Sequence, residues 1–252
     1  MKMVATIIHK GAEFRVDFSK PLDISIPLRA GEPNVNAWYV PPVKIEPVRM
    51  GDWVGDVNQG GPVNFKNIFL NPHGNGTHTE CVGHISREPF TLNQCLKTFF
   101  FLCEVISVLP EELANGDWVI GKKTIQASLG DRKTEALALR TLSNPPEKIN
   151  QHYSNTNPPY LTTEAMQFIL DAEVDHLLTE MPSGHKEKDD GSLVCHHLFW
   201  DYPSNPKTGK TISELIYIPN HIPDGSYLLN LQITSLESDA SPSKPCLYRI
   251  IP

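Results

Sequence analysis

The sequence lacks the features that define several large classes of protein. Its 5 cysteines are odd in number and form no CxxC motif, so neither a disulfide framework nor a thiolate zinc site is expected. No apolar run approaches the length of a membrane span. The net charge is −7 without any Lys/Arg cluster, which argues against nucleic acid and against an anionic membrane as partner. We therefore expect the protein to bind a small molecule.

Targeting signals and internal repeats are also missing. Residues 1–10 contain neither the long apolar region nor the cleavage site of a signal peptide, so we expect a cytoplasmic protein. A chain of 252 residues is long enough for one large domain or two small ones. Because no repeat or linker divides the sequence, we predict a single domain that spans residues 1–252.

One short stretch is rich in metal-binding side chains. Residues 73–84 contain three histidines, His73, His78 and His84, together with the carboxylate of Glu80. Imidazole and carboxylate together suit a cation such as Zn²⁺ or Mn²⁺, and the glycines in the stretch let the backbone turn tightly. The stretch therefore predicts a metal site, and the alternative is a hydrogen-bonded loop that binds nothing.

Cys81 lies in the same stretch and is a weaker candidate. A buried structural thiol is its commoner role, and the adjacent Glu80 carboxylate would raise the pKa of the thiol, which disfavours a nucleophile. Catalysis by Cys81 with His84 and without a metal also lacks any visible residue to orient the histidine.

A metal ion held by one loop alone would be short of ligands, so a second group should lie elsewhere. The Cys-His-His stretch at 195–197 and Glu214 are the obvious suppliers. If the chain there is extended, His196 and His197 point to opposite sides, and only one of them would reach the metal. On the residues alone, any other carboxylate would serve as well as Glu214.

The pattern of apolar residues indicates mixed helices and strands. Residues 98–108 and 136–141 read as strands buried on both faces, and residues 65–70 as a strand leading into the histidine stretch. A short helix is expected at 124–128, and a longer one from Thr162 or Thr163 to Asp175. Further strands are expected at 174–181, 212–218 and 226–236, and loops at 23–65.

Several of these segments resemble the putative cyclase family, which includes bacterial kynurenine formamidase and isatin hydrolase. The matching segments follow one another in the order seen in that family: Asp17–Leu22, Gly76–His84, Leu178–Ser183, Cys195–Leu198, Ser213–Leu215 and Ile222–Tyr227. The resemblance implies a compact, single-domain α/β fold of the swivelling β/β/α type with a mixed central sheet. It also implies a homodimer or homotetramer.

The resemblance assigns roles residue by residue. In the family the loop reads His-x-Gly-Thr-His-x-Asp-x-Pro-x-His, and a downstream His and Glu complete the metal site. His78 and Glu80 match the second and third loop ligands, and His84 matches the histidine that works in acid/base catalysis. His196 and Glu214 match the downstream ligands, which leaves His197 outside the ligand set.

The chain departs from the family loop in three places. Gly74 occupies the position of the first ligand, with His73 one place earlier, while Glu80 replaces Asp and Val82 replaces Pro. His73 would reach the metal only if the loop bulges by one residue. The longer Glu80 side chain would move the metal by about a methylene length.

These assignments predict a metal-dependent hydrolase, most simply a zinc enzyme with Mn²⁺ as the other candidate. The expected substrate is a small amide, formamide or cyclic amide or lactone, as for an arylformamidase-like enzyme, and Trp38, Trp53 and Trp200 are expected around the pocket. The competing hypothesis is a non-catalytic binding protein that kept the fold after losing the ligand at Gly74.

Overall fold

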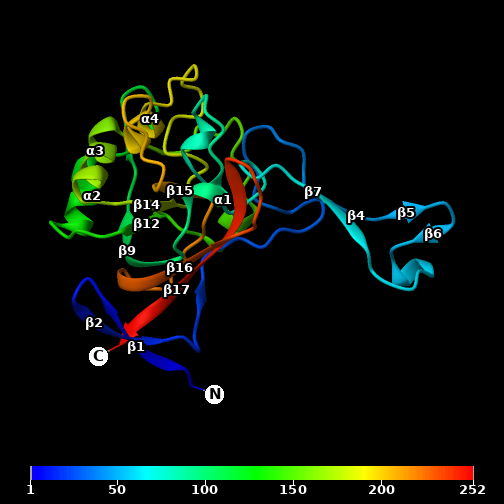
Figure 1. Cartoon of the computed structure of the whole chain (residues 1–252). Helices are drawn as coiled ribbons and strands as arrows, with labels where there is room; N and C mark the ends of the chain where they lie inside the picture. The colour runs from blue at the N-terminus through cyan, green and yellow to red at the C-terminus, as the bar shows by residue number, and fades with distance from the viewer. Residues whose placement is uncertain (1, 252) are drawn as a thin grey trace.

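A closed mixed sheet forms the centre of the computed structural model, which describes residues 2–251 (Figure 1). Around the ring the strands follow the order β8 (His78–Glu80), β15 (Thr211–Glu214), β14 (His176–Thr179), β12 (Ala136–Thr141), β9 (Phe100–Val108), β16 (Gly225–Ile233) and β17 (Ala240–Ile251). The ring closes because β17 pairs again with β8. Strands β9, β12, β14 and β15 are parallel to one another, and the other neighbours in the ring are antiparallel.

The central strands are buried on both faces, as their apolar sequences predict. In β12, Leu137 and Leu139 pack against the helices on the outside, whereas Ala138 turns into the enclosed face. β9 alternates in the same way, with Ile106 outside and Cys103 inside. The helices on the outer face are α2 (Lys122–Leu129), α3 (Thr163–Asp171) and α4 (Val194–Trp200).

Shorter elements surround the ring. Strands β1 (Val4–His9), β2 (Ala12–Asp17) and β3 (Leu22–Asp23) extend the sheet beside β17, and β10 (Glu111–Glu112), β11 (Trp118–Ile120) and β13 (Tyr160–Leu161) form a small sheet. The short helices are α1 (Leu92–Cys95), η2 (Val82–His84) and η3 (Pro146–Asn150). None of the helices within residues 2–251 has the length and apolar character needed to cross a bilayer.

One segment leaves the body of the molecule altogether. Residues 44–69, which we call the arm, project outward as the antiparallel pair β4 (Lys44–Pro47) and β7 (Lys66–Phe69) (Figure 1). Its far end carries β5 (Arg49–Met50), β6 (Trp53–Val54) and the turn η1 (Val57–Gln59).

The predicted α/β fold with a mixed central sheet is confirmed, and most of the predicted elements occur. The helix predicted from Thr162 begins there because the Thr162 side chain accepts a hydrogen bond from the amide of Ala165. Two predictions were wrong. The helix predicted to reach Asp175 ends at Asp171, and the strand predicted at 212–218 ends at Glu214. The segment containing His196 and His197, which was considered only for the case of an extended chain, forms the helix α4.

Candidate metal centre and its pocket

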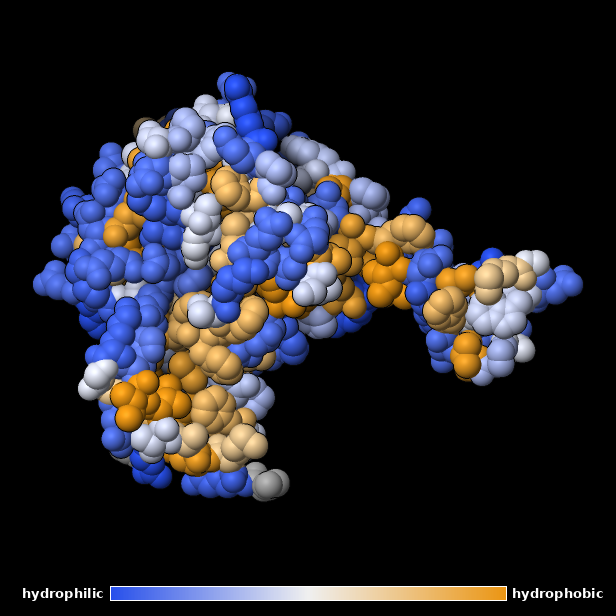
Figure 2. All heavy atoms as spheres, in the orientation of Figure 1, coloured by the Kyte–Doolittle hydropathy of each residue, from blue (hydrophilic) through white to orange (hydrophobic). Residues whose placement is uncertain are grey.

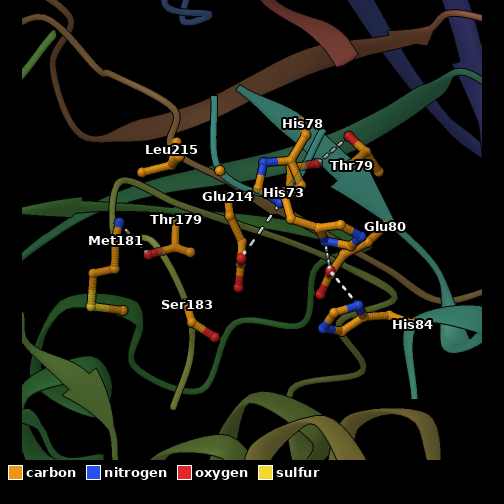
Figure 3. A network of polar contacts seen from close by, with 12 residues as sticks. His73, His78, Thr79, Glu80, His84, Thr179, Met181, Ser183, Glu214 and Leu215 are labelled. Atoms are coloured by element: carbon orange, nitrogen blue, oxygen red, sulfur yellow. Dashed lines mark hydrogen bonds and ion pairs between the residues drawn. The ribbon is translucent and has the colours of Figure 1, made fainter. Parts of the chain in front are cut away.

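Two paired strands bring the first three polar groups together. His78 and Glu80 are two residues apart on β8, so their side chains leave the strand on the same face. Glu214, the last residue of β15, is the direct cross-strand partner of His78. All three side chains are buried, and Figure 3 shows them turned toward a common space.

The tautomer of His78 prepares it to bind a cation. Its Nδ1 lies 2.9 Å from the carbonyl oxygen of Gly76, and because a carbonyl only accepts, Nδ1 is the donor. In the neutral ring the other nitrogen, Nε2, is an acceptor, and it faces Glu214 Oε2 at 3.6 Å. Two acceptors buried face to face repel each other unless a cation lies between them.

Glu80 connects the strand to two histidines from other segments. Its Oε1 lies 3.1 Å from His196 Nε2, and its Oε2 lies 3.2 Å from His73 Nδ1. Burial alone would raise the pKa of Glu80, but His84, His196 and His73 outweigh it and hold the pKa well below its usual range. The carboxylate therefore stays charged over the whole physiological range.

Helix α4 supplies His196 from the opposite side. Its Nε2 also lies 4.0 Å from Glu214 Oε1, so this imidazole faces both carboxylates. Within residues 2–251, three buried atoms of the cluster have no hydrogen-bond partner, namely His78 Nε2, His196 Nδ1 and Glu214 Oε1. Unpartnered buried polar atoms are costly, and imidazole nitrogens with carboxylate oxygens are the donor set of a zinc or manganese site. The residues fit a divalent metal ion.

His73 reaches the cluster despite its shifted position. A side chain at Gly74 is excluded, because a Cβ there would lie 2.7 Å from the carbonyl oxygen of Ala37. His73 instead lies between two carboxylates, with Nδ1 near Glu80 and Nε2 2.9 Å from Asp239 Oδ2. Burial lowers the pKa of His73, but Asp239 and Glu80 together raise it to about 10.

His84 ends the turn η2 at the rim of the cluster. Its Nδ1 lies 3.4 Å from Asp239 Oδ2 and 3.8 Å from Glu80 Oε2, and its ring is 4.4 Å from that of His73. Burial lowers the pKa of His84, whereas Glu80 and Asp239 raise it more strongly. His84 is thus a partly exposed imidazole beside the cluster, oriented by a carboxylate.

A cavity of about 360 Å³ opens onto the cluster. Its lining includes four residues of the cluster, His73, Glu80, His84 and Glu214, and six others, Trp38, Val40, Asn71, Ser183, His185 and Leu193. The ring of Trp38 stacks on His185 with 5.7 Å between centroids and 8° between planes. This volume and mixed lining suit a small, flat molecule with one polar end.

Two residues of this site were not predicted from the sequence. Asp239 comes from the segment just before β17, and the pairing of Ala240 with Glu80 brings it beside the histidines. His185 follows the Leu178–Ser183 segment and lies 4.9 Å from the ring of His196. Burial and His196 lower the pKa of His185 to about 4, so its side chain is uncharged at neutral pH where it lines the pocket.

Other candidates from the sequence lie elsewhere. His197 Nδ1 donates to the carbonyl oxygen of Tyr202, on a different side of α4. Cys81 is fully buried, and the Cys95 thiol together with burial raises the pKa of its thiol, which disfavours a nucleophile. The prediction that Trp53 lines the pocket was wrong, because Trp53 lies on the arm against Phe65. Trp200 is fully buried with its ring 5.4 Å from His196, behind the cluster.

Comparison with known proteins identifies the family. The sequence profile described as putative cyclase matches residues 19–185. The chain belongs to this family. A search of curated proteins gives no match.

Solved structures share the fold over nearly the whole chain. A potential metal-dependent hydrolase with cyclase activity is 15% identical with a TM-score of 0.65, and the alignment covers 92% of this chain and 99% of the other. An isatin hydrolase bound to the product analogue thioisatinate is 14% identical with a TM-score of 0.64, covering 92% and 93%. A predicted metal-dependent hydrolase from Bacillus stearothermophilus is 14% identical with a TM-score of 0.63, covering 91% and 98%. The chain thus has the fold of cyclase-family metal-dependent hydrolases.

Proposed function

We propose that the protein hydrolyses a small amide, formamide or cyclic amide or lactone, with a divalent metal ion held by His78, Glu80, His196 and Glu214. The observation that carries the proposal is the position of the buried His78 Nε2, which has no hydrogen-bond partner and faces Glu214 Oε2 at 3.6 Å. Zn²⁺ fits this donor set best, with Mn²⁺ as the alternative. When bound, the metal ion supplies Lewis acidity toward a carbonyl and lowers the pKa of water.

The chain's own residues then have distinct tasks. Trp38 and His185 form a flat wall that would orient an aromatic or otherwise planar substrate along the cavity. His84 lies at the cavity rim with Nδ1 held by Asp239, so its Nε2 is the nitrogen left to accept a proton and return it to the leaving group. Asp239 would stabilise the protonated imidazole.

His73 is proposed as a support for Glu80. Each of its ring nitrogens already lies near a carboxylate oxygen, and binding a metal would require it to give up the contact with Glu80. Its role as a fifth metal ligand stays a prediction, tested below. By family resemblance we also propose a cytoplasmic homo-oligomer.

The experiment combines metal analysis with a substrate panel. Protein purified without added metal is expected to contain about one transition-metal ion per chain and to open the ring of isatin or cleave an aryl formamide. The control is the same protein after chelation, which should lose the activity and regain it with Zn²⁺ or Mn²⁺. A chain that takes up no metal under these conditions would instead support a non-catalytic binding protein.

A further inference from the structure

A second cavity, which we call the side hollow, lies next to the candidate active-site cavity. It encloses about 320 Å³ and is lined by the small sheet β10–β11–β13, by the start of α3 and by the segment that leads into α4. His185 lines both cavities, and its ring centre lies 4.9 Å from that of His196. The side hollow therefore begins one side chain away from the candidate metal centre.

The wall between the two cavities is thin. The chain at 192–194 passes between them, because Leu193 lines the active-site cavity whereas its neighbours Ser192 and Val194 line the side hollow. His185 and Leu193 are both partly exposed, so the wall that they form reaches the surface of the protein. A ligand can thus extend from one cavity into the other along the outer edge of this wall.

Apolar side chains form much of the lining of the side hollow. They are Leu113, Val119, Leu161 and Val194, with the ring of Tyr160 beside them. Leu113 and Val194 are 42% and 46% exposed, so they leave apolar surface uncovered. Other exposed apolar residues lie on the arm and on the β1–β2 hairpin, which project from the body (Figure 2). Leu113 and Val194 differ from these because they border a cavity beside the candidate active site.

The charged residues of the lining favour a neutral ligand. Lys186 is already paired, with Nζ 2.8 Å from Asp117 Oδ2. The carboxylate of Asp189 accepts a hydrogen bond from the amide of Leu193 at 2.8 Å. Glu164 adds a further negative charge to the lining and would repel an anion. The side hollow therefore offers apolar surface but no uncompensated positive charge, which suits a neutral ring.

We propose that the side hollow is a second subsite for the substrate, which receives a neutral aromatic ring on the far side of the molecule from the amide that is cleaved. This inference rests on the proposed hydrolysis and narrows its substrate class to formamides or cyclic amides of two-ring compounds. Each cavity alone, at about 360 and 320 Å³, is at the lower end of the range of about 300–1,000 Å³ for ligand pockets. The two together have room for both rings.

The test compares substrates that differ by one ring. Formanilide is paired with its para-phenyl derivative, and isatin with the derivative that carries a phenyl group para to the ring nitrogen. On the metal-loaded full chain, the two-ring compound is expected to have a kcat/KM about 10- to 100-fold higher than its parent compound, because the second ring is buried. Leu113→Trp fills the side hollow and Leu113→Glu places a charge in it. Each variant should remove this gain and leave kcat/KM for the one-ring compound unchanged.

Leu109 provides a matched control. It is another exposed leucine, at 61%, four residues earlier in the chain, and it is not part of the lining of the side hollow. Leu109→Trp and Leu109→Glu should therefore keep the gain from the second ring. Because both leucines are exposed, all four variants should retain the circular dichroism and the metal content of the unaltered chain.

The outcomes separate this inference from the proposed function. If a one-ring compound is cleaved but the second ring gives no gain, the subsite is overturned and the hydrolysis stands. The same holds if both Leu113 variants keep the gain. If the metal-loaded chain cleaves none of the four compounds, the proposed hydrolysis is overturned and the subsite falls with it.

Discussion

Asp239→Asn is the substitution that most sharply tests the charge arrangement at the site. The change keeps the shape of the side chain and removes only its charge, next to His73 at 2.9 Å and His84 at 3.4 Å. A hydrogen bond to a charged group contributes about 1.5–3 kcal/mol. Because one third of the Asp239 side chain is exposed, solvent screens these contacts, and we take about 1 kcal/mol for each imidazole. The free energy of unfolding of the metal-free variant should therefore be about 2 kcal/mol lower than that of the metal-free parent.

The pH dependence of this difference has a defined sign. The pKa of His73 is raised from its ordinary value to about 10 in the folded protein. A raised pKa contributes stability that is fully present below the unfolded value of about 6.5 and is lost as the pH rises toward 10. The difference between parent and variant should thus be largest near pH 6 and shrink between about pH 7 and 10.

Urea unfolding of the chelated proteins across this pH range measures the effect, with Glu237→Gln as a control for an exposed carboxylate two residues away. Without the Asp239 charge the pKa of His84 should also fall, which would shift the acidic limb of the isatin hydrolysis profile to lower pH. A variant as stable as the parent at pH 6 would refute the assignment of Asp239 as the partner of both imidazoles.

Four further substitutions separate the roles within the site. His84→Ala should keep its metal and lower the turnover of isatin or an aryl formamide by roughly 10²–10⁴-fold, and loss of the metal would make His84 a ligand instead. His196→Ala should lose the metal, measured by elemental analysis after desalting, whereas His197→Ala should retain it; the reverse result would exchange the two assignments. His73→Gln should retain most of its metal because the amide still donates to Glu80, and a chain without metal would establish His73 as a ligand.

The sequence predicted the parts of the site that depend on local spacing. His78 and Glu80 were assigned to one site because they lie two residues apart in a single stretch. That stretch was expected to be a tightly turned loop, whereas the structure places both residues on one face of the strand β8. The buried apolar runs of β9 and β12 marked the parallel centre of the sheet. The choice of Glu214 followed only from the family resemblance, and the pairing of β15 with β8 that places it opposite His78 was not predicted.

The remaining parts depend on contacts that no local pattern encodes. Asp239 lies far along the chain from the histidine stretch and precedes a strand, β17, whose prolines and serines hide its strand character. Helix α4 is only seven residues long, too short for a helical period to stand out from an extended apolar run. Only β7 of the arm was predicted as a strand. The rest was read as loops because its short strands are separated by glycines and turns, and the length of the arm shows only in three dimensions.

Two of the three departures from the family loop, His73 with Gly74 and Glu80, are best understood together. The position of the first family ligand is closed here, since a Cβ at Gly74 would collide with the backbone of Ala37. His73 therefore enters the cluster from one residue earlier and meets a carboxylate oxygen, Glu80 Oε2, at 3.2 Å. A glutamate has one methylene more than the aspartate of the family and so extends farther from β8, far enough to contact His73 with one oxygen and His196 with the other. The shift of the histidine and the longer carboxylate thus compensate each other, which explains how the chain keeps a connected cluster without the family's first ligand.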